Sequence, residues 1–329
     1  MLIVQPAFLG DVVLTTCLIE ACHAAGYTVD FLLRRGNEGL LSAHPFVSRL
    51  LVWDKRQAKY RNWYALLKDI RSTRYHALIC PHRYASTGAW LAFSRAALRI
   101  GFRQNPLSFA FTHRFEHRFD DELHETERMH RLLPPLGING PALRPKLYPC
   151  AEDQEAVAKY KHGGRGYVTM APGSVWYTKR LPPERWVELI ERTQAAELDV
   201  YLLGGPDERR LCEGIATASG HRVEVLAGRL SLLSSAALMA GARMNYVNDS
   251  APLHLASAMN APVTAFFLNT APTLGFGPLS ERSYILEHDE PLACRPCART
   301  GREACPLGHF KCAQIDPTPT HTWDASSRL

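Results

Sequence analysis

The sequence predicts an α/β protein built from two doubly wound parallel sheets, and three observations support this fold class. Short apolar segments alternate with helical segments, as in parallel sheets covered by helices. A Pro- and Gly-rich segment at 132–149 interrupts the alternation, which then starts again. The 329 residues exceed what one hydrophobic core usually holds. We therefore expect two Rossmann-like domains, residues 1–150 and 151–329, facing each other across a cleft.

In the first half, the predicted strands and helices follow one another with short connections. The strands are expected at 2–5, 29–33, 49–52 and 77–80, and the clearest helices at 12–25 and 63–71. Gly10 and Asp11 stand where the first strand turns into the first helix, and Asp11 has two interpretations. It is a good helix N-cap, and it is also placed where open α/β sheets bind ligands.

The second half repeats the pattern after the linker. "GYVTMAPGS" predicts a strand and a turn, and "PPERWVELIERTQ" predicts a helix with Pro at its start. "DVYLLGGPDERRLCEGIA" predicts a strand, a Gly-Gly turn and a helix. "MNYVNDSAPLHLASAMNAPVTAFF" predicts a strand, a polar turn, a helix and a further strand.

Composition bounds the compartment and the class of protein. No apolar stretch approaches the roughly 18 residues that span a bilayer, and the first apolar residues read as a strand rather than as a signal peptide. Nine Cys, an odd number scattered through an α/β pattern, argue against a disulfide scaffold. We therefore expect a cytoplasmic protein.

The charge is concentrated in one part of the chain. Residues 34–118 contain 16 Lys and Arg against 4 Asp and Glu, whereas the whole chain has a net charge of only +6. Such a basic segment favours nucleic acid, an anionic membrane or an anionic substrate as partner, or is a solvated surface with none. Nucleic acid is disfavoured, because no zinc finger, RRM or helix-turn-helix signature accompanies the charge.

Polar groups follow one predicted strand of the second half. Residues 171–174 supply a Gly and the hydroxyl of Ser174, and Lys179 and Arg180 come soon after. Two cations there suit a pyrophosphate, with Arg offering a bidentate fork. The alternative is a solvated pair of loop residues.

A second polar turn follows a later strand. Asn248, Asp249 and Ser250 precede a helix whose free N–H groups favour an anion, and His254 lies near its first turn. The alternative here is a plain N-cap. The chain contains no GxGxxG fingerprint and no Walker A motif, which disfavours a dinucleotide oxidoreductase and a P-loop protein.

Four cysteines near the C-terminal end form a segment of their own, residues 294–312. Cys294, Cys297, Cys305 and Cys312, with His309 nearby, have the residue types of a tetrahedral zinc site. A disulfide or redox clip, or four reduced thiols packed in a loop-rich region, are the alternatives.

An ordered set of motifs resembles a known family. These motifs are "GDVVLTTCLIEA", "ALRIGF", "HETERMHRLLPPLGI", "APGSVWYTKRLPPERWVELI", "LLGGPDE" and "VNDSAPLHLASAMNAPVTAFF". Together they span residues 1 to about 315 and are similar to those of glycosyltransferase family 9, the ADP-heptose:lipopolysaccharide heptosyltransferases of GT-B fold. The resemblance implies inverting, metal-independent transfer of L-glycero-D-manno-heptose from ADP-heptose to the lipopolysaccharide inner core. It implies no cofactor, and an acceptor on the anionic inner face of the inner membrane.

The resemblance also implies roles for single residues. Asp11 would be the general base, and Lys179 would stabilise the departing ADP in place of a metal. The implied donor-binding residues are Gly10, Ser174, Arg180, Gly204, Gly205, Glu208, Asp249, Ser250, Ala251 and His254. Among them, Glu208 is a candidate for the ribose hydroxyls. Neighbours of the adenine are sought among Leu226, Ala227, Gly228 and Met239.

The base itself is expected to be weak. An ordinary Asp has a pKa near ~3.9, and a helix N-terminus would lower the pKa of Asp11 further. Proton transfer would then come late, as the bond to ADP breaks.

Other functions compete with this one. They are a related transferase using another nucleotide sugar or a protein acceptor, and a non-catalytic paralogue that only binds nucleotide sugar. The presence of both Asp11 and Lys179 disfavours the last.

Overall fold

The chain divides into two compact units, Met1–Tyr148 and Pro149–Leu329, called unit 1 and unit 2 below. The computed structural model describes residues 1–161 and 166–317. The unit boundary lies at the end of the segment expected to be a linker. Within that fully described segment, the 3₁₀ turn Pro134–Leu136 is the regular element.

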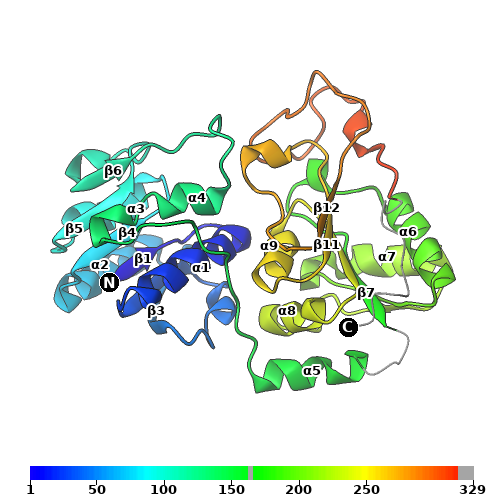
Figure 1. The fold of residues 1–329 in the computed structure, drawn as a ribbon, viewed down its shortest axis with the longest axis horizontal. Helices are drawn as coiled ribbons and strands as arrows, with labels where there is room; N and C mark the ends of the chain where they lie inside the picture. The colour runs from blue at the N-terminus through cyan, green and yellow to red at the C-terminus, as the bar shows by residue number, and fades with distance from the viewer. Residues whose placement is uncertain (162–165, 318–329) are drawn as a thin grey trace. The chain divides into compact units, whose positions relative to one another are not determined.

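Unit 1 contains a parallel sheet of six strands among the described residues, in the order β3-β2-β1-β4-β5-β6 (Figure 1). The strands are β1 (Leu2–Val4), β2 (Val29–Arg34), β3 (Val47–Trp53), β4 (Ala77–Cys80), β5 (Leu98–Phe102) and β6 (His113–Phe115). The helices are α1 (Leu9–Ala24), α2 (Lys59–Thr73), α3 (Ala85–Phe93) and α4 (Glu125–His130). The strand order reverses between β1 and β4, so the topological switch point of this doubly wound sheet lies at the carboxyl ends of these two strands.

The apolar strands of unit 1 form because both of their faces are covered. Every residue of β1 and β4 is buried, as the strands of a parallel sheet between helices require. Helix α1 packs against α4, and α2 packs against α3. In the core, Trp53 and Trp90 meet edge to face with their ring centres 4.9 Å apart. Such aromatic pairs add to the apolar area that each ring buries.

Unit 2 contains a second parallel sheet with the same kind of strand order, β12-β11-β10-β7-β8-β9, among its described residues. The strands are β7 (Tyr167–Ala171), β8 (Asp199–Leu202), β9 (Val223–Val225), β10 (Met244–Asn248), β11 (Val263–Phe266) and β12 (Ser283–Leu286). The helices are α5 (Ala151–Lys161), α6 (Pro183–Ala195), α7 (Arg209–Ser219), α8 (Leu232–Ala240) and α9 (Ala251–Ala258). Here the order reverses between β7 and β10.

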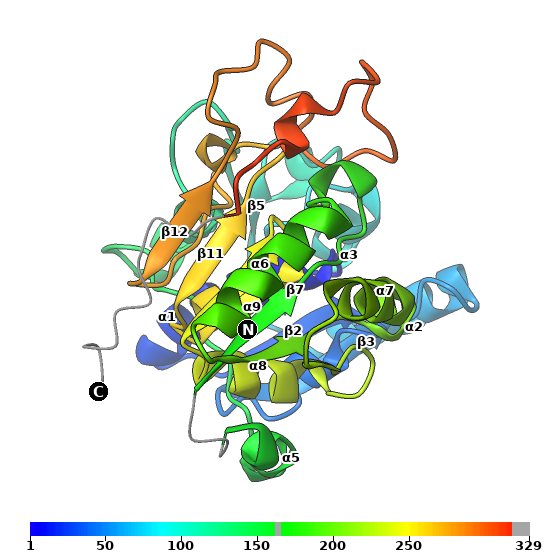
Figure 2. The ribbon, with the colours of Figure 1, turned by 90° about the vertical axis from the view of Figure 1, so that its right-hand side faces the viewer.

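The packing of unit 2 centres on a buried tryptophan of α6. Figure 2 shows α6 and α7, which pack against each other. The fully buried Trp186 of α6 donates its indole N–H to the carbonyl of Leu181 at 3.1 Å. Its ring meets that of Phe266 in β11 at 5.3 Å. Because its polar atom is paired, the whole ring can be buried without an orphaned donor.

The predicted doubly wound α/β fold is therefore confirmed, with differences at the element ends. Helix α1 begins at Leu9 rather than at residue 12, and α2 extends beyond the predicted 63–71 at both ends. Strand β6 was not predicted, because its residues His113–Phe115 are mostly exposed and carry no apolar run. Among the described residues, none of the helices has both the length and the apolar composition to cross a membrane.

Candidate active site

The predicted polar turns of unit 2 meet at its topological switch point. The turn of residues 172–174 follows β7, and Asn248–Ser250 follows β10, and these two strands are neighbours in the sheet. Open α/β sheets bind ligands in the crevice at such a place. The sheet therefore brings together two segments that are about 75 residues apart in the sequence.

Asn248 holds the two turns together. Its side chain is fully buried, and its amide group donates to the carbonyl of Pro172 at 2.9 Å. Its oxygen accepts the backbone N–H of Leu181 at 3.0 Å. The sequence predicted a polar turn for an anion, or alternatively a plain N-cap, and the structure shows that the Asn248 side chain links two loops. Its position directly after a buried strand is the signal that could have suggested this.

Lys179 and Asp249 form a close ion pair at the same place. The Lys179 ammonium lies 2.6 Å from Asp249 Oδ2, with only 15% of the lysine side chain and 5% of the aspartate side chain exposed. The same oxygen accepts the hydroxyl of Thr270 at 2.5 Å. Thr270 was not predicted, because no motif surrounds it. An ammonium with so little solvent around it is well suited to meet a diphosphate.

Ser174 and Arg180 belong to the same wall. The guanidinium Nε of Arg180 donates to the backbone carbonyl of Ser174 at 2.7 Å, and Ser174 is buried. Arg180 therefore fixes the turn that follows β7 by holding its backbone.

Glu208 reaches this turn from the neighbouring strand end. One carboxylate oxygen accepts the backbone N–H of Gly205 at 2.8 Å. The other lies against Gly173, where an added Cβ would be only 1.9 Å from it. At Gly204, a Cβ would lie 2.9 Å from the Glu208 carboxylate. Glycines at these positions therefore make the room in which the carboxylate sits.

The start of α9 lies at the same edge of the unit 2 sheet. Ser250 is the N-cap residue, yet its side chain does not cap the helix, and its hydroxyl makes a long contact of 3.4 Å to the Asn248 carbonyl. Ala251 begins the helix, and His254, one turn along, is 6% exposed. The positive end of the helix dipole thus points from the same edge of the sheet as Asp249.

The residues expected near the adenine differ in their exposure. Leu226, Ala227 and Met239 are buried in unit 2 with at most 1% of their surface exposed. Their side chains are therefore part of the packed interior of unit 2. Gly228 is exposed and donates its N–H to the carbonyl of Gly204 at 2.9 Å, so it alone of the four borders the site.

In unit 1, Asp11 lies in the first turn of α1, near the switch point between β1 and β4. Phe8 is the N-cap residue, and Asp11 is the third helical residue, which corrects the expected N-cap role. Its carboxylate reaches back and accepts the backbone N–H of Phe8 at 3.2 Å. This is the acidic half of a capping box.

The pKa of Asp11 moves opposite to the sequence-based expectation. Burial raises its pKa to about 6, and the negative charge of Glu125 acts in the same direction. The hydrogen bond from Phe8 and the cations Arg83 and Arg34 lower it, but by less. Loss of hydration therefore outweighs the helix N-terminus. A carboxyl group with this pKa is better matched to accept a proton near neutral pH than an ordinary Asp.

Glu125, on α4, is held in place by two buried groups. Both of its carboxylate oxygens lie 2.9 Å from Nε2 of His117, whose side chain is fully buried. Arg128 Nη1 donates to Glu125 at 3.3 Å. Because Arg83 lies 3.2 Å from Nδ1 of His117 and can only donate, we assign the proton of the neutral imidazole to Nε2. The sequence predicted none of these residues for the site.

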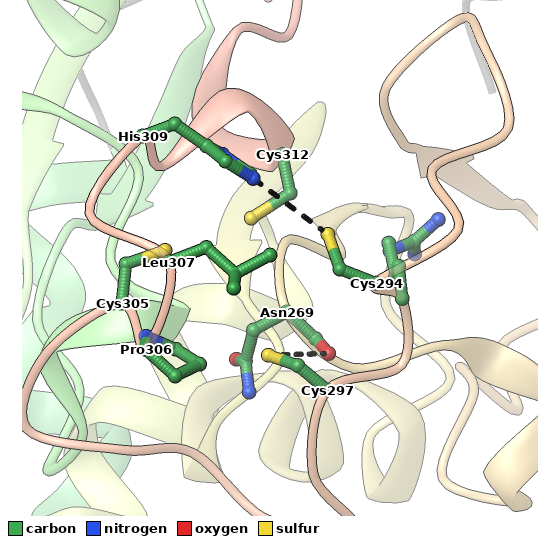
Figure 3. Close-up of a pocket in the computed structure, with 9 residues that line it drawn as sticks. Asn269, Cys294, Cys297, Cys305, Pro306, Leu307, His309 and Cys312 are labelled. Carbon is green, nitrogen blue, oxygen red and sulfur yellow. Dashed lines mark hydrogen bonds between the residues drawn. The ribbon is translucent and has the colours of Figure 1, made fainter.

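The four C-terminal cysteines gather around one small cavity (Figure 3). Its volume is about 20 Å³, and its lining includes all four thiols, His309 and Leu307. Cys294 Sγ lies 4.0 Å from His309 Nε2, and Cys297 points its sulfur at the Asn269 carbonyl 3.9 Å away. All the cysteines of the chain are free thiols. Within 1–161 and 166–317, no group of three or more His, Cys, Asp or Glu is arranged to hold a metal ion.

Comparison with known proteins shows the family to which this chain belongs. The model of glycosyltransferase family 9 (heptosyltransferase) matches residues 63–306. Lipopolysaccharide heptosyltransferase 1 of Pseudomonas aeruginosa is 28% identical over 317 residues, covering 91% of this chain and 86% of that protein.

Two solved structures from E. coli share the fold. ADP-heptose lps heptosyltransferase II superposes with a TM-score of 0.75 and 20% identity, covering 87% of this chain and 89% of that chain. Heptosyltransferase WaaC with ADP gives a TM-score of 0.72 and 22% identity, covering 86% of this chain and 92% of that chain. These likenesses confirm the two-domain GT-B fold.

Proposed function

Because this chain belongs to glycosyltransferase family 9, the heptosyltransferases, we propose that it transfers L-glycero-D-manno-heptose from ADP-heptose to the lipopolysaccharide inner core. The match to the family model over residues 63–306 carries this proposal. It is supported by the similarity to Pseudomonas aeruginosa lipopolysaccharide heptosyltransferase 1 along 91% of the chain. The related E. coli WaaC structure contains ADP, which supports an ADP-linked donor.

The proposed reaction inverts the anomeric carbon of the heptose. Asp11 takes the proton from an acceptor hydroxyl as that oxygen bonds to the anomeric carbon. The bond from this carbon to the diphosphate oxygen breaks, and its electron pair leaves with ADP. A carboxylate whose pKa is raised to about 6 is ionised at neutral pH and still basic enough to assist.

The leaving group needs positive charge, and unit 2 supplies it from side chains and backbone. Lys179 is the leading candidate for this positive charge, because its ammonium is largely shielded from solvent. The N-terminus of α9, beginning at Ala251, adds a favourable dipole for a phosphate. This arrangement takes the place of a divalent metal in the proposed mechanism.

The remaining donor contacts follow from the same edge of the sheet. Ser174 and the backbone of Gly204 and Gly205 would line the diphosphate and ribose, with Glu208 beside the ribose hydroxyls. Asp249 and Ser250 would meet the sugar and diphosphate. Gly10, Arg180 and His254 remain proposed neighbours.

Two measurements test the proposal. Thermal unfolding is followed with ADP-, UDP-, GDP- and CDP-linked sugars, because a ligand that binds the folded state raises its stability. Transfer of labelled heptose from ADP-heptose is then measured on lipopolysaccharide that lacks inner-core heptose and on a protein acceptor. We expect stabilisation by ADP-heptose and transfer to the lipopolysaccharide. Stabilisation by another nucleotide sugar alone, or transfer to the protein alone, would overturn the proposal.

Binding without transfer would identify a non-catalytic paralogue. The Lys179→Ala variant is measured alongside the wild type. It should weaken donor binding as well as turnover, because the Lys179 charge is proposed to act on the diphosphate in both the ground state and the transition state.

A further inference from the structure

The cysteine segment, residues 294–312, takes no part in the chemistry proposed above, yet it contacts the candidate site. Beyond β12 it runs as an irregular loop, in which the 3₁₀ turn Lys311–Ala313 is the one regular element that the structure describes. Its four thiols line one cavity of about 20 Å³, so the segment folds back on itself around its own sulfurs (Figure 3). A long irregular loop in a compact domain is uncommon and is often functional.

The cysteine segment is hydrogen-bonded to the turn that carries Lys179. The backbone N–H of Thr178 donates to the carbonyl of Arg302 at 3.1 Å. In return, the backbone N–H of Arg302 donates to the hydroxyl oxygen of Thr178 at 2.8 Å. Thr178 directly precedes Lys179 and is 1% exposed, so little water competes for these bonds. The cysteine segment therefore holds the residue next to the lysine by hydrogen bonds in both directions.

Two aromatic residues before Lys179 pack against the same segment. Gly301 lies so close to Trp176 that an added Cβ would be 2.1 Å from the Trp176 side chain. The ring of Tyr177 stacks on that of Phe310, with the ring centres 5.4 Å apart. Three consecutive residues before the lysine are therefore in contact with the cysteine segment. The 3₁₀ turn that ends at Lys179 has only three residues, and so short a turn depends on its tertiary contacts for its shape.

Asp249, the partner of the lysine, is connected to the same segment. The backbone N–H of Cys297 donates to the carbonyl of Asn269 at 3.1 Å, and the Asn269 side chain donates to the carbonyl of Thr300 at 3.2 Å. Figure 3 shows Asn269 beside Cys297. The next residue is Thr270, whose hydroxyl donates to the Asp249 carboxylate. The cysteine segment thus contacts the residues that adjoin both members of the ion pair.

We propose that the cysteine segment is a positioning element for Lys179. It connects the turn of the lysine with the residues that hold Asp249, and it thereby fixes where the ammonium meets the donor. This inference rests on the proposed function, in which the ammonium binds a diphosphate. Because the lysine is largely shielded from solvent, a displacement of about 1 Å weakens its attraction to a phosphate. The segment acts through the lysine rather than on the donor itself.

The first variants change the contact between Thr178 and Arg302. Thr178→Val keeps the shape of the side chain but leaves the Arg302 N–H without its acceptor, whereas Thr178→Ser keeps the hydroxyl. Binding of ADP and ADP-heptose is measured by isothermal titration of the full chain, and KM and kcat by transfer of labelled heptose. Thr178→Val should weaken binding of both ligands and raise the donor KM several-fold, and Thr178→Ser should stay near the wild type.

Gly301→Ala tests the contact from within the cysteine segment, because its methyl group must push the Trp176 side chain aside. The matched control is Gly214→Ala in α7, where an added Cβ meets nothing within 4 Å. Gly301→Ala should weaken ADP binding several-fold, and the control should bind ADP as the wild type does. Wild-type affinity in both Thr178→Val and Gly301→Ala would overturn the proposal.

A double variant separates positioning from general damage to the site. Thr178→Val is combined with Lys179→Ala, and ADP affinity is compared with that of each single variant. If the segment acts through the lysine, Thr178→Val causes no further loss once the ammonium is absent, because the two changes remove the same interaction. An equal loss with and without the lysine would contradict a positioning role.

Amide hydrogen exchange provides a readout that needs no ligand. Exchange in residues 174–180 should be faster in Thr178→Val and Gly301→Ala than in the wild type and in Gly214→Ala. Unchanged exchange there would overturn the proposal. If ADP binding and exchange respond as expected but no heptose is transferred by the wild type, the proposed function fails and the positioning role stands. If heptose is transferred and both variants behave as the wild type, only the positioning role fails.

Discussion

At the scale of single residues, Asp11 carries a pH dependence of folding that can be measured. Its pKa is raised to about 6 in the folded protein, from 3.8. Below about pH 4 the group is protonated in both states, and its protonation favours neither. As the pH rises through 6, the folded state must ionise a poorly hydrated carboxyl group, and stability is lost.

Asp11→Asn should therefore stabilise the protein at pH 7.5 by roughly 1–2 kcal/mol, since two pKa units correspond to at most ~3 kcal/mol and Asp11 is not fully buried. The asparagine oxygen can still accept the Phe8 N–H. Turnover should fall ~10²–10⁴-fold, as for loss of a general base. Urea unfolding at pH 4.5 and 7.5, with single-turnover rates, checks both. Wild-type turnover in the variant would reduce Asp11 to a helix-capping residue and make His254 the next candidate base.

Glu125 should tune this titration. Because its negative charge raises the pKa of Asp11, Glu125→Gln should move the acidic limb of the rate profile to lower pH, by roughly half to one unit. The control is Glu122→Gln, an exposed residue three positions before the first residue of α4. Rates are measured from pH 5 to 8. A damaged fold would lower the plateau and leave the limb in place, and that outcome would contradict a tuning role.

The sequence indicated the candidate site residues better than it indicated their surroundings. Asp249 directly follows β10, and Asp11 and Lys179 lie in the segments that follow β1 and β7, where motif and position agree. The predicted direction of the Asp11 pKa shift was wrong, because the pKa is raised by burial in the folded unit and by the charge of Glu125 on α4, which the local sequence does not reveal. Thr270 was missed because no motif surrounds it, and only the fold brings its hydroxyl to Asp249.

At the scale of elements, the turn after β7 depends on a glycine. Gly173→Ala would place a methyl group on the Glu208 carboxylate, which must then leave its position. We expect donor affinity to fall several-fold with a small change in unfolding temperature, because the far end of a flexible side chain moves rather than backbone. The matched control is Gly214→Ala in α7, where an added Cβ meets nothing within 4 Å. That control should gain up to ~1 kcal/mol of stability. Wild-type donor affinity in Gly173→Ala would show that Glu208 has no part in binding.

In the cysteine segment 294–312, the thiol of Cys305 should react more readily than that of Cys312. Burial acts to raise the pKa of Cys305, but backbone N–H groups of residues 307–310 hydrogen-bond to its sulfur and lower the pKa below its ordinary value. Burial instead raises the pKa of Cys312 to about 11. Cys305 should therefore be alkylated by iodoacetamide at pH 7.5 well before Cys312, as mapped by mass spectrometry. Labelling of Cys305 only after a chelator or a reductant would instead indicate a bound metal or a disulfide.

Element types were predictable where apolar periodicity was strong, and element ends were not. Helix α1 begins three residues early because Phe8 is extended and Asp11 reaches back to its N–H. Gly10, a poor helix former, lies inside the first turn. That choice is made by the capping box, which local propensity does not reveal.

At the scale of the whole molecule, the uneven charge predicts different salt responses for the two ligands. Exposed charges are screened beyond ~8 Å at physiological ionic strength. Binding of a phosphorylated acceptor to the basic unit 1 should weaken strongly between 0.05 and 0.5 M salt, on the order of tenfold or more. Donor binding is proposed to use a few shielded contacts, such as that of Lys179, and should therefore change less. Isothermal titration at several salt concentrations measures both, and equal slopes would remove the argument for a basic acceptor surface.

The fold of both units could be predicted from the alternation of strands and helices, together with the interruption at 132–149. The meeting of the two polar turns of unit 2 could also be predicted, because both follow strands of one sheet. The side-chain contacts between different elements could not. Parallel strands with short connections leave few topologies, so the order of strands is constrained. Side-chain networks such as His117 with Glu125 depend on loop paths that no periodicity encodes.

The ion pair of Lys179 and Asp249 has a consequence for selectivity among the anions of a cell. The Lys179 ammonium already lies 2.6 Å from the Asp249 carboxylate, so an incoming anion must compete with this carboxylate for the lysine. Inorganic phosphate would make few contacts to compensate for the loss of this ion pair, whereas a nucleotide sugar would make many. After the proposed reaction, Asp249 can form the ion pair with Lys179 again, which would favour the release of ADP. Asp249→Asn should accordingly bind phosphate and ADP more tightly and suffer stronger product inhibition, which progress curves with added ADP would reveal.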